Sequence, residues 1–284
     1  MAKRIDPRAF IDALLPVVDQ CARATQIFYG QVADIGKAAD KTLISNHAQD
    51  ASTAFTVLDG AVQDILLAAV LQHFPQVRCI AEERTPLKKH FAGNTSPHTV
   101  ILDPIDGTYH FKRGDAPYHI TIGLACDGEM LASIVARPSA GKTFTAIKGG
   151  GAYVQIGKRR PRRLRLPKKP RTNKAFISSK ARPHQVLARP DFDPRENPIG
   201  AALVLTQLAE GELCAYLTRQ VEIYDAGPPS LIAEEAGARC YIGEGRRPAY
   251  TQRCKFGYFV AAANDDIAAQ LFAIIRQVKR NKDA

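Results

Sequence analysis

The feature that most constrains this chain is a short acidic motif at the end of an apolar run. Residues 99–102 predict a buried strand, and residues 103–108 continue as Asp-Pro-Ile-Asp-Gly-Thr. Proline and glycine after a strand favour a turn. The sequence therefore places two carboxylates and a Gly-Thr pair where a buried strand ends, a common location for binding and catalytic groups.

The residue types of this motif suit a metal ion and a phosphate. Asp103 and Asp106 supply hard oxygen ligands, and their mutual repulsion is relieved when a cation such as Mg²⁺ lies between them. Pro104 stiffens the turn, while Gly107 and Thr108 offer N–H groups that can open a helix and receive an anion. We therefore predict a magnesium-assisted phosphoester reaction. Taken alone, the motif is equally typical of a surface turn.

Further segments agree with the motif in their order and approximate spacing. They are Phe-Thr-Val-Leu-Asp at 55–59, Ile-Ala-Glu-Glu at 80–83, Gly-Gly-Gly-Ala-Tyr at 149–153, and Tyr-Asp-Ala-Gly at 224–227 followed by Ala-Glu-Glu-Ala-Gly at 233–237. Together with residues 103–108, these segments resemble the inositol monophosphatase family from about residue 8 to about residue 265.

The resemblance implies an α/β (α+β) fold, a layered α-β-α-β-α sandwich of the inositol monophosphatase and sugar phosphatase type. We expect residues 1–157 to form a first half that carries most metal ligands. Residues 158–174 would form a basic connector, and residues 175–284 a second half that supplies Asp225 and the substrate-specificity residues.

The resemblance also implies two or three Mg²⁺ ions. Glu82, Asp103 and the carbonyl of Ile105 would hold the first ion. Asp103, Asp106 and Asp225 would hold the second, and a third, more weakly bound ion would contact Glu82. Several carboxylates with divalent ions supply the charge neutralisation that phosphate ester hydrolysis requires.

By the same resemblance, Asp59 and Thr108 orient and deprotonate the attacking water, and we count Glu82 with these catalytic residues. A threonine hydroxyl can relay a proton when it is hydrogen-bonded to a carboxylate. The phosphate would lie on the metals and on the N–H groups of Gly107 and Thr108. Taken alone, Asp59 is as typical of the cap of a helix expected from residue 61 as of a catalytic acid.

Some positions depart from the family pattern. Tyr224 replaces the usual tryptophan, a change that the metal site tolerates. Thr218 stands where inositol-specific enzymes carry a glutamate, with Arg219 beside it, and both are candidate specificity residues. A proline pair at 228–229 is expected only in a first helical turn or a loop. We therefore predict that catalysis is retained and that inositol specificity is lost.

The positive charge is concentrated in one segment. The net charge is +11, and ten of the 17 residues from Lys158 to Lys174 are Lys or Arg. Three alternatives stay open for this basic segment, namely a solvated connector, nucleic-acid binding through phosphates, and attraction of a highly anionic substrate. The segment has no aromatic residue to stack on bases, which disfavours the second alternative.

The remaining composition indicates a cytoplasmic protein. The six cysteines have no CxxC pair and are expected to be reduced. No run of residues predicts a signal peptide or a membrane span. His110 and His119 flank the acidic motif, but structural roles are favoured over metal binding because no Cys/His ligand spacing surrounds them.

Periodicity predicts alternating helices and strands. Helices are expected at 7–35, 61–74, 200–208, 231–236 and 265–279, and strands at 77–81, 100–102, 118–126, 130–137, 142–148, 152–156, 174–178, 214–218 and 257–262. We therefore expect a homodimeric phosphoric monoester hydrolase of the inositol-phosphatase type that acts by direct attack of a metal-activated water. Alternatives are a histidinol-phosphatase, a 3′(2′),5′-bisphosphate nucleotidase, a fructose-1,6-bisphosphatase, or a regulatory RNA- or protein-binding member of the fold.

Overall fold

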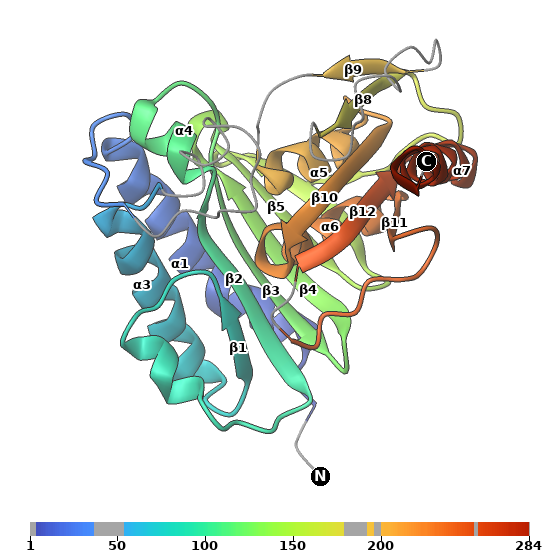
Figure 1. Ribbon diagram of the computed structural model, residues 1–284. Coiled ribbons are helices and arrows are strands. Elements are labelled where there is room, and N and C mark those ends of the chain that lie inside the picture. Colours follow the sequence, from blue (N-terminus) through green and yellow to red (C-terminus); the bar gives the residue numbers. More distant parts are fainter. Residues whose placement is uncertain (1–3, 37–53, 179–191, 196–199, 253–254, 284) are drawn as a thin grey trace.

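The computed structural model describes residues 4–36, 54–178, 192–195, 200–252 and 255–283. The elements form alternating layers (Figure 1). Helices α1 and α3 cover one face of a seven-stranded sheet, and α5 and α6 pack between this sheet and a five-stranded sheet. Helix α7 packs on the other face of the second sheet. The expected α-β-α-β-α sandwich is confirmed.

The first half contains the larger sheet, in the order β1-β2-β3-β4-β5-β6-β7. Its helices are α1 (Pro7–Ile27), α3 (Val57–His73), η1 (Leu87–Phe91), α4 (Thr108–Arg113) and η2 (Pro138–Ala140). Its strands are β1 (Arg78–Ala81), β2 (His98–Asp106), β3 (His119–Cys126), β4 (Glu129–Arg137), β5 (Lys142–Ile147), β6 (Gly151–Ile156) and β7 (Arg162–Leu164). Because β1 and β2 are parallel, their carboxyl ends lie at the same edge of the sheet.

The second half contains the smaller sheet, in the order β11-β12-β10-β8-β9. Its strands are β8 (Lys174–Ile177), β9 (Asp193–Arg195), β10 (Ala215–Glu222), β11 (Arg239–Ile242) and β12 (Lys255–Ala262). Its helices are α5 (Ala201–Glu210), α6 (Ile223–Ala236) and α7 (Asp265–Asp283). Apolar side chains of α5, α6 and both sheets form one buried cluster that joins the halves.

Helix α1 follows its sequence signals at the start but ends early. Asp6 caps it by accepting a hydrogen bond from the Arg8 N–H at 2.9 Å, and Pro7 opens the first turn. Phe10, Leu14 and other buried residues form the stripe that faces the sheet. The prediction that this helix continues to residue 35 is wrong, because the chain turns after Ile27.

The proline pair lies inside α6, so the expectation of a first turn or a loop is wrong. A proline at 228 cannot donate to the carbonyl of Tyr224, and the Thr121 hydroxyl lies 3.5 Å from that oxygen. The carbonyl of Pro228 accepts a hydrogen bond from the Ser133 hydroxyl at 2.6 Å. Side chains of the first sheet therefore bind the backbone of α6 where the helix carries its prolines.

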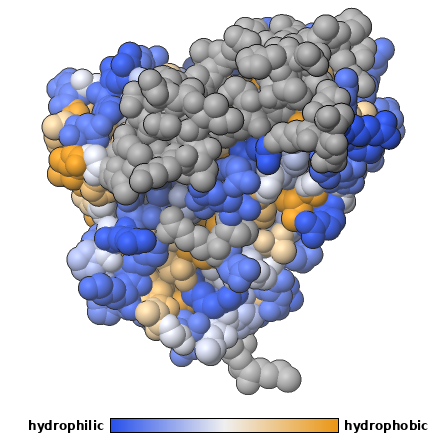
Figure 2. Space-filling model, viewed as in Figure 1, coloured by the Kyte–Doolittle hydropathy of each residue, from blue (hydrophilic) through white to orange (hydrophobic). Residues whose placement is uncertain are grey.

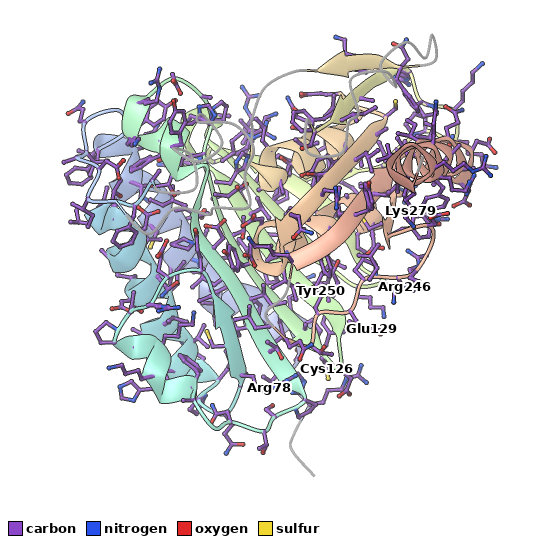
Figure 3. All side chains as sticks on the ribbon, in the orientation of Figure 1. Arg78, Cys126, Glu129, Arg246, Tyr250 and Lys279 are labelled. Carbon is purple, nitrogen blue, oxygen red and sulfur yellow. The ribbon has the colours of Figure 1, made fainter. Side chains whose placement is uncertain are left out.

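The segment before β12 returns to the first half. Its Tyr250 N–H donates to the Gly128 carbonyl at 2.9 Å, and the Arg78 guanidinium donates to the Thr251 carbonyl at 3.0 Å. Figure 3 shows Tyr250, Arg78 and Cys126 toward the end of the first sheet that lies away from α4. In the view of Figure 2, hydrophilic residues cover much of the described surface.

Candidate active site

The acidic motif lies at the end of β2 below α4. The strand continues through Asp106, further than the predicted end at Leu102, and its pairing with β3 shifts between Asp103 and Asp106. The Ile105 N–H donates to Asp103 Oδ1 at 3.0 Å. Gly107 then takes a left-handed φ of 93° and caps α4, a conformation that favours glycine. This irregular strand end directs both aspartates into the protein.

Four carboxyl groups meet near this strand end, and we call Glu82, Asp103, Asp106 and Asp225 the acidic cluster. Glu82 follows β1, and its N–H donates to the Leu102 carbonyl at 3.2 Å, which sets it beside the end of β2. Asp225 comes from the first turn of α6. Asp103 and Asp106 are only 2% and 6% exposed. The topology therefore brings together acids that are more than 100 positions apart in the sequence.

Two members of the acidic cluster, Asp103 and Asp106, have shifted titrations. Burial raises the pKa of Asp103 well above its usual range, and repulsion from Glu82, Asp106 and Asp225 raises it further. Burial raises the pKa of Asp106 to about 7, although the N–H of Ala202 opposes this shift by donating to the carboxylate. In the protein alone, Asp103 and Asp106 therefore keep their protons to a higher pH than exposed aspartates do.

The chemistry of the acidic cluster fits a divalent cation. In the part of the chain that the structure describes, no three His, Cys, Asp or Glu side chains are already arranged as ligands of one ion. Burial and the neighbouring Glu82 raise the pKa of Asp103, so this buried acid favours the form that carries a proton. A cation can replace this proton and satisfy the same oxygens, and carboxylates with a carbonyl are the donors that Mg²⁺ prefers. The donor set therefore suits the metal expected from the sequence.

Asp59 and Thr108 lie in direct contact. The Thr108 hydroxyl donates to Asp59 Oδ1 at 2.8 Å and also lies 2.9 Å from the Ile105 carbonyl. Asp59 Oδ2 accepts hydrogen bonds from the N–H and hydroxyl of Thr56 at 2.8 and 2.6 Å. The expectation that Asp59 caps a helix from residue 61 is wrong, because α3 begins at Val57 with Thr56 as its N-cap; one Asp59 oxygen closes a capping box with Thr56 and the other reaches Thr108. Burial raises the pKa of Asp59.

Helix α5 reaches the acidic cluster at its first turn. The Ala202 N–H donates to Asp106 Oδ2 at 2.8 Å. A Cβ on Gly200 would lie 2.1 Å from Asp106 Oδ1, so only glycine fits at the start of this helix. The sequence reading did not single out these residues. The periodicity that predicted a helix at 200–208 carries no information about which groups its first turn would contact.

The two candidate specificity residues lie on opposite faces of β10. Arg219 is paired with Tyr258, and its guanidinium lies 5.0 Å from the centre of that ring. Thr218 is buried on the other face with Tyr216. Burial raises the pKa of Tyr216, which a hydrogen bond with Thr218 opposes and the charges of Asp106 and Asp225 support. The structure thus brings Thr218 and Tyr216 toward the acidic cluster, but not Arg219. Tyr216 was missed, although it lies two positions before Thr218.

Two of the segments that resemble the family, residues 149–153 and residues 233–237, bind each other away from the acidic cluster. Glu235 accepts hydrogen bonds from the N–H groups of Gly149 and Gly151, each at 2.8 Å. Gly149 and Gly151 have left-handed φ values of 74° and 90°, which lets the turn between β5 and β6 present both groups. These segments therefore hold α6 against the first sheet rather than supplying groups to the acidic cluster.

The basic segment is solvent-exposed at every Lys and Arg. These residues are Lys158, Arg159, Arg160, Arg162, Arg163, Arg165, Lys168, Lys169, Arg171 and Lys174. The segment also contains β7, which pairs with β6 at the edge of the first sheet. Residues Arg162–Leu164 of the basic segment therefore form the last strand of the first sheet.

The structure also describes the cysteines, the histidines and the tyrosine whose roles were predicted from the sequence. Five cysteines, namely Cys21, Cys79, Cys126, Cys214 and Cys240, are free, and Cys254 lies outside the described residues. His110 pairs with Asp115 through Nδ1 at 2.7 Å, and His119 is buried beside Arg137. Tyr224 is buried, as expected for a residue in the tryptophan position. Among the residues described, no helix is both long and apolar enough to cross a membrane.

Comparisons with known proteins point to a single family. The sequence model of the "Inositol monophosphatase family" matches residues 16–280. An inositol-1-monophosphatase of Mycobacterium bovis is 29% identical over 232 residues, covering 78% of each chain. Inositol monophosphatase 2 of Mus musculus is 26% identical over 279 residues, which are 94% of this chain and 90% of that protein. The solved Thermotoga maritima IMPase has a TM-score of 0.76 at 18% identity and covers 96% of this chain and 99% of its own.

Proposed function

Because the chain belongs to the inositol monophosphatase family, whose members are phosphatases of phosphomonoesters, we propose that it hydrolyses a small phosphomonoester with Mg²⁺ at the acidic cluster. The observation that carries this proposal is the convergence of four buried or partly buried carboxyls beside the hydrogen-bonded Asp59–Thr108 pair. A cluster of acids with raised pKa values is costly to fold without a cation. Such a cost is typical of a functional site.

The ligand set follows the family resemblance. Glu82, Asp103 and the Ile105 carbonyl would hold one Mg²⁺, and Asp103, Asp106 and Asp225 would hold a second. A third ion would contact Glu82. When bound, the ions neutralise charge on the transferred phosphoryl group and lower the pKa of water. The buried positions of Asp103 and Asp106 support this assignment because few other partners are available to charged carboxylates there.

The Asp59–Thr108 pair would move the proton of the attacking water. The Thr108 hydroxyl accepts this proton while it passes its own to Asp59 Oδ1, along the 2.8 Å hydrogen bond. The raised pKa of Asp59 makes this carboxylate a better proton acceptor than an exposed aspartate. The N–H groups of Gly107 and Thr108 would receive the phosphate. Water attacks phosphorus directly, with no covalent enzyme intermediate.

Phosphate release from a substrate panel tests the function. The panel contains inositol 1-phosphate, histidinol phosphate, fructose 1,6-bisphosphate and adenosine 3′,5′-bisphosphate, each with Mg²⁺ and with EDTA. The proposal requires release from at least one substrate with Mg²⁺ and its loss with EDTA. Release that continues in EDTA, or no release from any substrate, would contradict it.

The raised pKa values predict that Mg²⁺ binds more tightly as the pH rises from about 6 to about 8. The folded pKa of Asp106, about 7, exceeds its unfolded value, so the metal-free protein loses stability as the pH rises toward 7. Mg²⁺ replaces the proton, and its binding therefore gains from deprotonation. We expect Mg²⁺ to raise the Tm more at pH 8 than at pH 6. An equal or smaller shift at pH 8 would show that these carboxyls do not bind the ion.

The presence of Thr218 predicts a low kcat/KM for inositol 1-phosphate. A neutral hydroxyl replaces a carboxylate that accepts two hydrogen bonds from vicinal hydroxyls, a loss of about 2 kcal/mol or about 30-fold in kcat/KM. We expect a bisphosphate to have the higher kcat/KM. If the basic segment attracts this substrate, the advantage shrinks as ionic strength rises from about 0.05 to 0.3 M. Thr218→Glu should reverse the preference, and a salt-independent wild-type preference for inositol 1-phosphate would refute this prediction.

The remaining proposals concern assembly and the basic segment. We propose a homodimer, with a first half at 1–157, a basic connector at 158–174 and a second half at 175–284. Contact of the basic segment with nucleic acid is a second candidate function, which the exposure of its ten Lys and Arg side chains favours. Retention of RNA on a filter by the wild-type protein, and its loss when residues 158–163 lose their charges, would support that function.

A further inference from the structure

A buried guanidinium joins the first sheet to α5. Arg137 is the last residue of β4 and is 6% exposed. Its Nε donates to His119 Nε2 at 3.1 Å, and its two terminal nitrogens reach Thr206 Oγ1 at 2.5 Å and Glu210 Oε2 at 3.4 Å. One side chain therefore connects two strands of the first sheet with a helix of the second half.

The contacts of α5 lie along a single face. Ala202, Thr206 and Glu210 are four positions apart and therefore lie one above another on the helix. The Thr206 hydroxyl donates to the Ala202 carbonyl at 2.7 Å, so the Thr206 oxygen accepts from Arg137 while its proton returns to the helix backbone. Lys142 also pairs with Glu210, at 2.5 Å. This face is held by hydrogen bonds and ion pairs to the first sheet.

The same face ends at the acidic cluster. The Ala202 N–H donates to Asp106 Oδ2 at 2.8 Å, and Asp106 is the cross-strand partner of His119. The contacts thus form a closed circuit from Asp106 through Ala202, Thr206, Arg137 and His119 back to Asp106. Because these contacts form a closed set, they restrain the position of α5 along its axis, relative to the end of β2, more strictly than a single contact does.

The contact between α5 and Asp106 leaves little room for movement. A Cβ at Gly200 would lie 2.4 Å from the Cγ of Asp106 as well as 2.1 Å from Oδ1, so the helix start already touches the carboxylate. A small displacement of α5 along its axis would therefore either press on Asp106 or release it from the Ala202 N–H. The position of this carboxylate depends on where the distant end of α5 is held.

We propose that Arg137 is a positioning residue that sets Asp106 for divalent cation binding by holding α5 in place. This inference rests on the proposed function of the acidic cluster. We assign Arg137 no part in the chemistry itself, because its guanidinium binds His119, Thr206 and Glu210, none of which belongs to the acidic cluster. Removal of the guanidinium takes away the donor that holds the Thr206 oxygen and lets the first turn of α5 shift. The expected consequence is weaker metal binding rather than slower chemistry.

Calorimetric titration of the metal-free protein with Mg²⁺ tests the proposal. Residues that orient metal ligands typically change metal affinity by about tenfold or more, so Arg137→Met should raise the Kd for Mg²⁺ by about tenfold. Thr206→Val keeps the side-chain volume and removes the accepting oxygen, and it should also raise the Kd for Mg²⁺. At saturating Mg²⁺, kcat in both variants should stay within about threefold of wild type, because the reacting groups are unchanged.

Two controls separate positioning from general destabilisation. Arg276→Met removes an exposed guanidinium on α7 that pairs with Glu244, and its Mg²⁺ affinity should stay within about twofold of wild type. Thr206→Ser keeps the hydroxyl and should restore the affinity that Thr206→Val loses. If Thr206 has a structural role alone, Thr206→Val should lower the Tm, and the Mg²⁺ affinity should not fall in Thr206→Val and return in Thr206→Ser.

The outcomes decide between the alternatives. Wild-type Mg²⁺ affinity in folded Arg137→Met or in Thr206→Val overturns the positioning role and leaves the proposed function standing. If Arg137→Met does not fold, Thr206→Val alone decides. Failure of the wild-type protein to bind Mg²⁺ overturns the proposed function, and the positioning role with it.

Discussion

Asp103→Asn should abolish turnover and leave the fold intact. By the family resemblance, this carboxylate is shared by both principal cations, so a neutral amide weakens two sites at once. The amide still accepts the hydrogen bond of the Ile105 N–H. It also relieves the repulsion from Glu82, Asp106 and Asp225 that raises the pKa of Asp103. The metal-free variant should therefore be at least as stable as the wild-type protein.

Phosphate release and thermal unfolding of the same samples measure this result. The matched control is Asp12→Asn, which removes one exposed carboxylate from α1 and should leave both quantities unchanged. In wild type, Mg²⁺ should raise the Tm, and this shift should be lost in Asp103→Asn. Retention of more than about a tenth of the wild-type activity would contradict the bridging role.

Thr108→Ala and Asp59→Asn should each lower kcat by about two to four decades. The two side chains share a 2.8 Å hydrogen bond, so either change breaks the path of the proton. Neither residue belongs to the proposed ligand set. The Mg²⁺ affinity should therefore change less than in Asp103→Asn.

The double variant distinguishes a relay from two separate contributions. Groups that act as a unit lose most of their effect with the first substitution, so the double variant should be little slower than the slower single variant. Thr108→Ser keeps the hydroxyl and should retain more activity than Thr108→Ala. Fully additive losses in log kcat would show that Asp59 and Thr108 act independently.

The sequence predicted the elements that have strong local signals. The strands from 118 to 156 and α7 appear close to their expected positions, because apolar periodicity and cap residues are local properties. The family motifs supplied what periodicity could not, namely that Glu82, Asp103, Asp106 and Asp225 share one region. Their approach depends on parallel pairing of β1 with β2 and on the packing of α6.

The errors arose where tertiary contacts decide the local structure. The chain leaves α1 after Ile27, where Gly30 takes a left-handed φ of 72° and its N–H binds the Phe111 carbonyl. Helix α6 keeps two prolines because Thr121 and Ser133 of the first sheet approach its backbone carbonyls. A propensity argument uses only neighbouring residues and cannot detect partners 95 or more positions away.

The buried network of Arg137 was also beyond the sequence reading. Its partners lie 18, 69 and 73 positions away in the sequence. His119 was expected to have a structural role, but nothing in the sequence pointed to Arg137 as its partner. For the same reason, strand alternation could have separated Thr218 from Arg219, although it could not show which of the two faces the acidic cluster.

Anomalous diffraction from crystals grown with Mn²⁺ and phosphate tests the central claim most directly. Mn²⁺ binds the same carboxylate and carbonyl oxygens as Mg²⁺ and scatters anomalously. We expect two strong anomalous peaks that share Asp103 as a ligand, one also bound by Glu82 and the Ile105 carbonyl and the other by Asp106 and Asp225. Crystals in which no peak lies within bonding distance of Asp103 would contradict the assignment of the acidic cluster as the metal site.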